Sequence, residues 1–283
     1  MNRNMTAGVQ SSSRNSKRGC IMNRISVAAM ALVVLSAPAV AADMLVPDKA
    51  PPPAFNWTGF YVGGDIAVAS TNLNAQSNAL PASVVPLGVE QISGGVGGAG
   101  DFAGGGFAGY NLQFASRFVA GIEADWTSMN NDGRLTSNWL DNTGVMVQNA
   151  TTTLSSELQW AASVRGRFGY LIVPSFLAYA TGGVAWGKWE YGANSTYPTI
   201  GYTASTAFAK TDTGWVAGIG FEWAPFSHYG LLNGLLLRAE YLNYRFGGTQ
   251  ATASAAGFPT APSAYLWSSP DVNVGRIGAS YKF

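Results

Sequence analysis

The sequence is short of charge, cysteine and histidine. Only 11% of its 283 residues are charged, against about 25% in an ordinary soluble domain. Its one cysteine, Cys20, excludes an intrachain disulfide and a zinc site built from several cysteines. Its one histidine, His228, leaves little scope for catalysis by imidazole. The formal net charge of +1 creates no field for nucleic acid, so the composition argues against both an ordinary cytosolic enzyme and a nucleic-acid-binding protein.

Apolar residues, glycine and aromatics are abundant instead. Hydrophobic residues make up 47% of the chain and aromatics 12%, and 35 residues are glycine. Disorder requires low hydrophobicity and high charge, so this composition excludes it for the chain as a whole. Many glycines and aromatics with few charges indicate β-structure whose surroundings are less polar than water.

The amino-terminal region carries the three-part pattern of a secretory signal peptide. Basic residues precede an apolar run over 25–35, and Ala39-Val40-Ala41 offers a small-x-small cleavage site before Ala42. The run is shorter than the ~20 residues that a transmembrane helix needs, so a signal peptide over 22–41 is favoured over an anchor.

Three further segments follow from this reading. Met22 offers a second start of translation, and a start there would make 1–21 an upstream extension. Residues 42–54 are rich in proline and predict a periplasmic spacer. Residues 55–283 contain no apolar run of 18 residues and therefore no transmembrane helix, and we expect them to form one β-barrel.

Segments of the body alternate between apolar and polar residues with a period of two, as strands do. Eight such segments can be delimited, at 60–69, 106–113, 118–126, 157–170, 177–191, 211–223, 235–246 and 272–283. The connections at 70–105, 127–156, 192–210 and 247–271 are long and rich in small polar residues, whereas those between them are short. Short turns on one side and long loops on the other predict an eight-stranded antiparallel transmembrane up-and-down barrel with periplasmic turns and extracellular loops. Because an open edge in hydrocarbon would leave backbone groups unpaired, the last segment must pair with the first.

One face of each clean segment is apolar, and the other collects the charges. In a membrane barrel the apolar face meets lipid and the charges lie inside; in a secreted lipocalin-like barrel, the alternative, the faces are reversed. Tyrosine and tryptophan near segment ends favour the membrane, where they form interfacial girdles: Trp126, Tyr170, Trp215, Trp223, Tyr241 and Tyr281. The charged residues expected inside are Asp65, Glu123, Asp125, Glu157, Arg165, Arg167, Glu222, Arg238, Glu240, Arg276 and Lys282.

These interior charges have two interpretations. They would either line an ion pathway or pair with one another and fill the lumen. Eight strands leave an interior just wide enough for side chains, so the sequence favours a structural network over a channel.

Four motifs carry a family resemblance. They are Asn56-Trp57-Thr58-Gly59-Phe60-Tyr61-Val62-Gly63-Gly64, Val164-Arg165-Gly166-Arg167-Phe168-Gly169-Tyr170, Tyr179-Ala180-Thr181-Gly182-Gly183-Val184-Ala185-Trp186-Gly187 and Tyr281-Lys282-Phe283. In this order they resemble the outer-membrane immunogenic proteins of α-proteobacteria, a group often labelled "porin family" and related to opacity-type antigens and to the OmpA barrel domain. The resemblance implies an eight-stranded outer-membrane barrel without enzymatic activity. It also implies that Tyr281 and Phe283 form the signal that barrel-insertion machinery recognises.

Together these observations predict a structural and surface-antigen protein of the bacterial outer membrane, without cofactor, metal or nucleic acid. Its expected partners are outer-membrane lipid, lipopolysaccharide, the insertion machinery, and host or phage molecules at the loops. The alternative is a small diffusion porin for ions or small solutes. A lipid-modifying enzyme would need His228 as a base, yet His228 falls in a short turn on the periplasmic side.

Overall fold

The structure is a computed structural model that describes residues 55–78, 92–140, 145–227, 230–255 and 258–283. The predicted signal peptide and spacer, the cleavage site between Ala41 and Ala42, and His228 lie outside these ranges. None of the helices within them is long and apolar enough to cross a bilayer.

Strands dominate the described residues, as the period-two alternation predicts. In chain order they are β1 (Gly59–Asn72), β2 (Asn74–Asn78), β3 (Ile92–Gly95), β4 (Ala99–Phe114), β5 (Phe118–Leu140), β6 (Met146–Val173), β7 (Phe176–Tyr197), β8 (Tyr202–Trp223), β9 (Leu235–Phe246), β10 (Thr249–Ala255), β11 (Phe258–Trp267) and β12 (Asp271–Lys282). Two 3₁₀-helices of one turn each, η2 (Pro198–Ile200) and η3 (Gly230–Leu232), lie in the connections.

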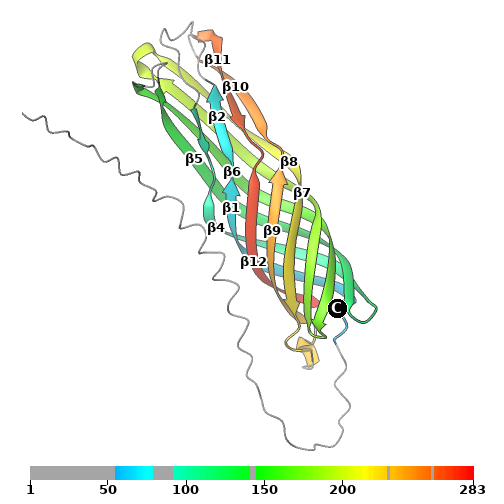
Figure 1. Ribbon diagram of the computed structural model, residues 1–283. Coiled ribbons are helices and arrows are strands. Elements are labelled where there is room, and N and C mark those ends of the chain that lie inside the picture. The colour runs from blue at the N-terminus through cyan, green and yellow to red at the C-terminus, as the bar shows by residue number, and fades with distance from the viewer. Residues whose placement is uncertain (1–54, 79–91, 141–144, 228–229, 256–257) are drawn as a thin grey trace, which may run out of the picture. The chain divides into compact units, whose positions relative to one another are not determined.

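Eight of the strands form a closed antiparallel barrel in the order β1-β12-β9-β8-β7-β6-β5-β4 (Figure 1). Pairing of β1 with β12 closes the ring, from Tyr61 opposite Lys282 to Asn72 opposite Asp271. The predicted eight-stranded barrel is therefore confirmed, and so is the pairing of its first and last strands. Closure satisfies the backbone groups that an open sheet would leave unpaired at its edges.

Consecutive barrel strands meet at one end through short connections, namely residues 115–117, 174–175 and 224–234. In the first of these, Ala115 and Ser116 have φ of 46° and 61°, the left-handed conformation that reverses the chain, and Arg117 N–H donates to the carbonyl of Ala115 (2.8 Å). The carboxy-terminus lies at this same end (Figure 1). These are the short turns that the sequence predicts.

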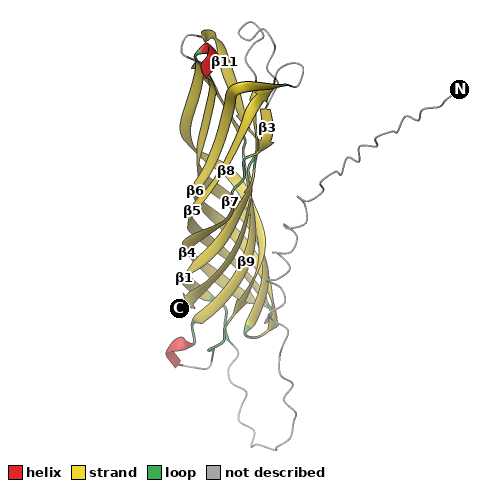
Figure 2. Ribbon diagram, turned by 90° about the vertical axis from the view of Figure 1, so that its left-hand side faces the viewer, coloured by secondary structure: helices red, strands yellow, loops and turns green. Residues whose placement is uncertain are grey.

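The connections at the other end are long, but much of their length is strand rather than irregular loop. β5 to β8 run on through 127–156 and 192–210 (Figure 2). The segments 70–105 and 247–271 supply a second, four-stranded sheet of order β10-β11-β2-β3. We call this sheet, together with residues 130–140, 146–158, 188–197 and 202–213, the cap.

Barrel and cap expose different kinds of side chain. In the barrel the apolar face is turned outward: Phe60, Ile122 and Ile219 are 68%, 66% and 60% exposed. In the cap the apolar face is turned inward, where Leu154 and Trp189 are fully buried. Since apolar groups avoid water, this inversion indicates that the barrel is surrounded by lipid and the cap by water.

A bulge at Gln159 in β6 separates the two patterns. Leu158 lies opposite Trp189 and Trp160 opposite Lys188, so no residue of β7 lies opposite Gln159 in the strand register. One extra residue moves all following side chains to the other face of the sheet. Leu158 consequently points inward, and so do Ser163 and Arg165 beyond the bulge.

Candidate functional site

The outside of the barrel carries an apolar belt between two aromatic girdles. The girdle toward the cap comprises Trp126, Trp160, Trp186, Trp215 and Tyr241, and the girdle at the short turns comprises Tyr110, Phe118, Tyr170, Phe176, Trp223 and Tyr281. Beyond the girdle toward the cap, the outward residues become polar, as at Ser128, Lys188 and Thr213. Tryptophan and tyrosine, whose rings carry a polar N–H or O–H group, favour the boundary between hydrocarbon and water, so the belt is the part of the barrel that spans the membrane.

The inside of the barrel at belt height holds a cluster of nine buried charged side chains, which we call the ion network. It consists of Asp65, Glu123, Asp125, Arg165, Arg167, Glu222, Arg238, Glu240 and Arg276. These side chains come from β1, β5, β6, β8, β9 and β12, so the network ties together strands that are far apart in the sheet. All nine belong to the set that the alternation predicts for the interior.

Glu123 lies at the centre of the ion network. Its carboxylate accepts hydrogen bonds from Arg165 and from both terminal nitrogens of Arg238 (2.9 and 3.1 Å). It also accepts one from the Tyr61 hydroxyl (2.9 Å), which in turn accepts one from Arg167 (2.9 Å). A buried carboxylate is tolerated only when it is paired in this way.

Glu240 is a second hub beside it. It accepts hydrogen bonds from Arg165 (2.9 Å), Arg238 (2.7 Å) and Arg276 (2.6 Å). The remaining acids each have a principal partner. Asp125 Oδ2 accepts a hydrogen bond from Arg165 Nε (3.1 Å). Asp65 Oδ2 lies 3.3 Å from Arg276 Nη1, and Glu222 Oε1 lies 2.9 Å from Arg167 Nη2. Every guanidinium therefore faces at least one carboxylate.

Aromatic rings and glycines shape the space around the guanidiniums. The Arg167 guanidinium lies 3.9 Å from the centre of the Tyr179 ring, and that of Arg238 lies 3.7 Å from the centre of the Phe107 ring. The Tyr179 ring reaches over the inward side of Gly220, where a Cβ atom would collide with it. Glycine is needed at such a position because the tyrosine occupies the place of a side chain.

Apolar layers close the lumen on both sides of the ion network. At the short-turn end Trp57 is fully buried against Phe55, Leu177 and Leu236, and its indole N–H donates to the carbonyl of Pro174 (3.0 Å). Toward the cap the lumen is filled by aromatic rings in contact, among them Trp189, Tyr191, Phe246 and Trp267, whose neighbouring ring centres are 5.3–6.0 Å apart. Paired ions between two apolar layers make a packed interior.

Two predicted members of the ion network lie elsewhere. Glu157 precedes the bulge at Gln159 and is therefore on the outer face of the cap, which corrects its predicted interior place. Lys282 lies at the rim of the barrel, with Nζ 5.5 Å from the centre of the Phe55 ring and 3.3 Å from the carbonyl of Phe283. Lys282 is the last residue of β12, so its side chain lies between the ion network and the short-turn end of the barrel.

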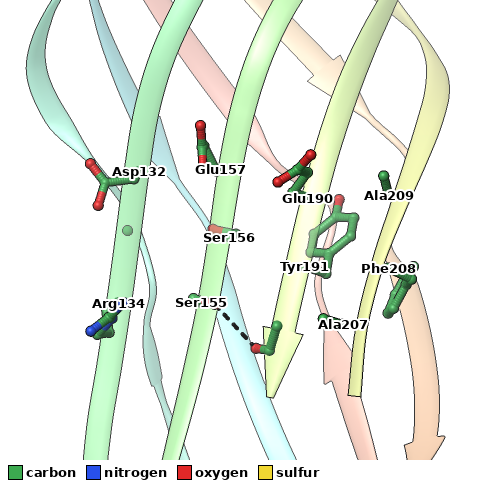
Figure 3. Close-up of a pocket in the computed structure, with 12 residues that line it drawn as sticks. Asp132, Arg134, Ser155, Ser156, Glu157, Glu190, Tyr191, Ala207, Phe208 and Ala209 are labelled. Carbon is green, nitrogen blue, oxygen red and sulfur yellow. Dashed lines mark hydrogen bonds between the residues drawn. The ribbon is translucent and has the colours of Figure 1, made fainter. Parts of the chain in front are cut away.

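Glu157 forms instead part of an acidic row on the outside of the cap. Asp132 is registered opposite Glu157, which is registered opposite Glu190 (Figure 3). The row lines a groove of about 420 Å³, together with Arg134 and Ser155. Like charges directly opposite one another destabilise a sheet, so this row costs the cap some stability.

The predicted assembly signal lies at the rim beside the short turns. Tyr281 and Phe283 form an edge-to-face ring pair with centres 5.5 Å apart, and Phe283 is 74% exposed. The Phe283 N–H donates to the carbonyl of Phe60 (2.9 Å), which fixes the end of the chain to β1. Both rings are presented on the outer surface of the barrel.

Tyr61, Ser163 and Trp57 belong to the site but are not among the charged residues that the sequence predicts for the interior. Tyr61 and Ser163 extend the ion network through hydrogen bonds to Glu123 and Asp125. The period-two alternation places Tyr61 and Ser163 on the inward face of their strands. Which acid each contacts depends on the register between the strands. Among the described residues, no group of three or more histidine, cysteine, aspartate or glutamate side chains is placed to hold a metal ion.

Comparisons with known proteins agree with this geometry. A family model described as an outer membrane protein beta-barrel domain matches residues 27–283. The 31 kDa outer-membrane immunogenic protein of Brucella melitensis biotype 1 is 28% identical over 263 residues, which cover 91% of this chain and 97% of the relative, and that of Brucella suis matches equally.

Solved outer-membrane barrels resemble the structure more distantly. Neisserial surface protein A is 14% identical with a TM-score of 0.36, and the match covers 80% of this chain and 98% of the other. The attachment invasion locus protein Ail of Yersinia pestis is 13% identical with a TM-score of 0.32, covering 80% of this chain and 99% of Ail.

Proposed function

Because the chain belongs to the outer membrane protein beta-barrel domain family, we propose that this integral outer-membrane protein works as a closed structural barrel that displays the cap beyond the membrane. Its location in the bacterial outer membrane and its relation to immunogenic outer-membrane proteins are established by the family match and the Brucella relatives. The proposal adds that the barrel is filled and that the cap is the part which acts at the surface.

The packing of the lumen carries the first part of the proposal. The side chains of Arg165 and Arg238 are 0% exposed, and that of Glu123 is 3% exposed. Eight-stranded barrels have room for side chains but not for a wide water column. A solute would have to break several buried ion pairs at once, each of which costs several kcal/mol to separate without replacement.

Planar-bilayer recording tests the closed barrel against the diffusion porin. Refolded full-length protein should give no steady open-channel current, and Trp57→Ala should give none either, because the ion network still closes the lumen. Steady currents from the unaltered protein would overturn the proposal and favour the porin.

The ion network also supports a role other than catalysis. Its guanidiniums and carboxylates are paired with one another, so no carboxylate of the hubs is left free to act as a base. We therefore infer that the protein is not an enzyme. Phospholipid hydrolysis and acyl transfer, measured with the refolded protein and with His228→Ala, should be absent in both; an activity lost on that exchange would establish the enzyme.

The cap supports the role at the surface. Its outer wall is rich in threonine, serine and asparagine and carries the acidic row, so it suits water and the lipopolysaccharide layer rather than acyl chains. We infer that the cap contacts lipopolysaccharide, and host or phage molecules where it emerges, and that it is the antigenic part. Antibodies raised against refolded protein should label intact cells and lose binding when Asn194 and Ser205 are replaced by lysine; labelling only of broken cells would contradict this.

A further inference from the structure

The turn between β8 and β9 is the longest of the three short turns, and its surface at η3 is apolar. Residues 223–237 contain no aspartate, glutamate, lysine or arginine, although this segment includes the whole connection 224–234 at the short-turn end. Leu231 of η3 is 91% exposed and Leu232 is 49% exposed. By contrast, the turn at 115–117 exposes Ser116 and Arg117, as expected for a loop in water.

The apolar turn is held against the lipid-facing side of the barrel. The Tyr281 hydroxyl donates to the carbonyl of Leu231 (3.2 Å), and the Lys282 N–H donates to the carbonyl of Gly234 (2.8 Å). Tyr281 belongs to the aromatic girdle at the short turns, on the outer face of β12. Figure 2 shows η3 at the end of the barrel where the carboxy-terminus lies.

The surface of the turn is continuous with the apolar belt. Trp223, which precedes the turn, is 47% exposed, and Leu237, which follows it, is 40% exposed on the same outer face. Phe283, 74% exposed, adds a further ring beside Tyr281. Two leucines facing water at this place would be unfavourable, because their apolar surface would stay hydrated.

We propose that the η3 turn is an interfacial anchor, which inserts Leu231 and Leu232 among the phospholipids of the periplasmic leaflet. Short apolar segments next to aromatic girdles partition into the boundary between head groups and acyl chains. The anchor rests on the membrane position of the belt, and it would fix the depth and tilt of the barrel on the side of β8, β9 and β12.

Site-specific fluorescence tests the anchor. Cys20 is the one cysteine of the sequence, so the full-length protein with Cys20→Ser has none. A single label can then be introduced in turn at Leu231→Cys, Ser116→Cys or Ile219→Cys. The environment-sensitive fluorophore NBD on each site is measured in phosphatidylcholine vesicles, with brominated phosphatidylcholine as the lipid quencher and iodide as the aqueous quencher. We expect the label at Leu231 to be quenched by bromolipid nearly as strongly as that at Ile219, and the label at Ser116 to be quenched by iodide.

The controls separate failure of the anchor from failure of the barrel position. If the Ile219 label is quenched by bromolipid and the Leu231 label by iodide, the anchor is wrong and the belt is right. If the Ile219 label is quenched by iodide, the membrane position of the belt itself is wrong. A Leu231 label that neither quencher reaches would place the turn against protein and also overturn the anchor. A label at Leu232→Cys should shift to longer emission wavelength when Leu231→Asp is added, because an aspartate draws the turn into water.

Discussion

Among single residues, Glu123 and Glu157 make the sharpest comparison. Both have the inward phase in the sequence, yet Glu123 is 3% exposed among guanidiniums and Glu157 lies on the outer face of the cap. We expect Glu123→Gln to destabilise the folded barrel by about 3 kcal/mol, because it removes ion pairs whose partners stay buried. The shift of the urea unfolding midpoint in lipid vesicles, followed by the heat-modifiable gel mobility of the folded barrel, measures this.

Glu157→Gln is the matched control. It leaves the ion network intact and removes one negative charge from the row of Asp132, Glu157 and Glu190. The free energy of unfolding should stay within about 0.5 kcal/mol of the unaltered protein or rise slightly, since repulsion between opposed like charges is relieved. Equal loss of stability in both variants would contradict the separation of these two residues.

Tyr191 gives the cap a dependence on alkaline pH. Burial raises the pKa of Tyr191, and the negative charge of Asp212 raises that pKa further. An unfolded tyrosine loses its proton at about pH 10, so the stability that the neutral phenol contributes is present below about pH 10 and is lost as the pH rises toward the raised pKa. The near-ultraviolet circular dichroism of the aromatic side chains in the cap should decrease as the pH rises above about 10.

Tyr191→Phe should weaken that dependence without abolishing it. Burial also raises the pKa of Tyr202, which adds a contribution of the same sign from the same cap. A dichroism signal that changes with pH identically in both proteins would show that Tyr191 is not responsible.

At the scale of elements, the strand faces could be predicted from the sequence and the strand lengths could not. Phe60, Val62 and Ile66 alternate with Tyr61, Gly63 and Asp65, so hydrophobicity alone fixes which face of β1 meets lipid. In the cap the outer face carries threonine, serine and alanine, which contrast too weakly with the inner face to stand out as strand. The segments 127–156 and 192–210 therefore resemble loops in composition, although β5 to β8 continue through them.

The period-two alternation of the sequence does not reveal the bulge in β6. Leu158, Trp160 and Ala162 have the spacing of one continuous apolar face, and only the register with β7 shows that Gln159 is an extra residue. This single residue is the reason that Glu157 was misplaced. The pairing of the nine network residues likewise follows from strand register, which a sequence of isolated strands does not specify.

Deletion of Gln159 tests the role of the bulge. Without it, residues 146–158 must either turn Leu154 and Leu158 outward and Glu157 inward, or shift register against both neighbours. We expect a severe loss of folded, heat-modifiable protein, whereas Gln159→Ala, which keeps the residue count, should fold normally. Normal folding of the deletion variant would show that the two halves of β6 need no change of phase.

At the scale of the whole molecule, the interior consists of three layers and the outer wall of two zones. The lumen is apolar around Trp57, ionic around Glu123 and aromatic around Trp189, whereas the outer wall is apolar along the belt and polar on the cap. The ionic layer coincides with the zone surrounded by lipid, and the aromatic layer with the zone surrounded by water. Apart from the apolar layer around Trp57 at the short-turn end, each zone places on its inside the chemistry that its surroundings would disfavour, so the same strands can pass from lipid into water.

This inversion predicts a switch of solvent along single strands. Spin labels at Ile122 on β5 and Ile219 on β8 should be relaxed by dissolved oxygen, which concentrates in lipid, and protected from an aqueous nickel complex. Labels at Asn138 on β5 and Ser205 on β8, both exposed on the cap, should show the reverse. Because each pair shares a strand, differences in labelling or folding affect both members alike, and only the surroundings distinguish them. Nickel access at Ile122 and Ile219 would refute the lipid-facing belt, whereas oxygen-dominated relaxation at Asn138 and Ser205 would show that the membrane extends over the cap.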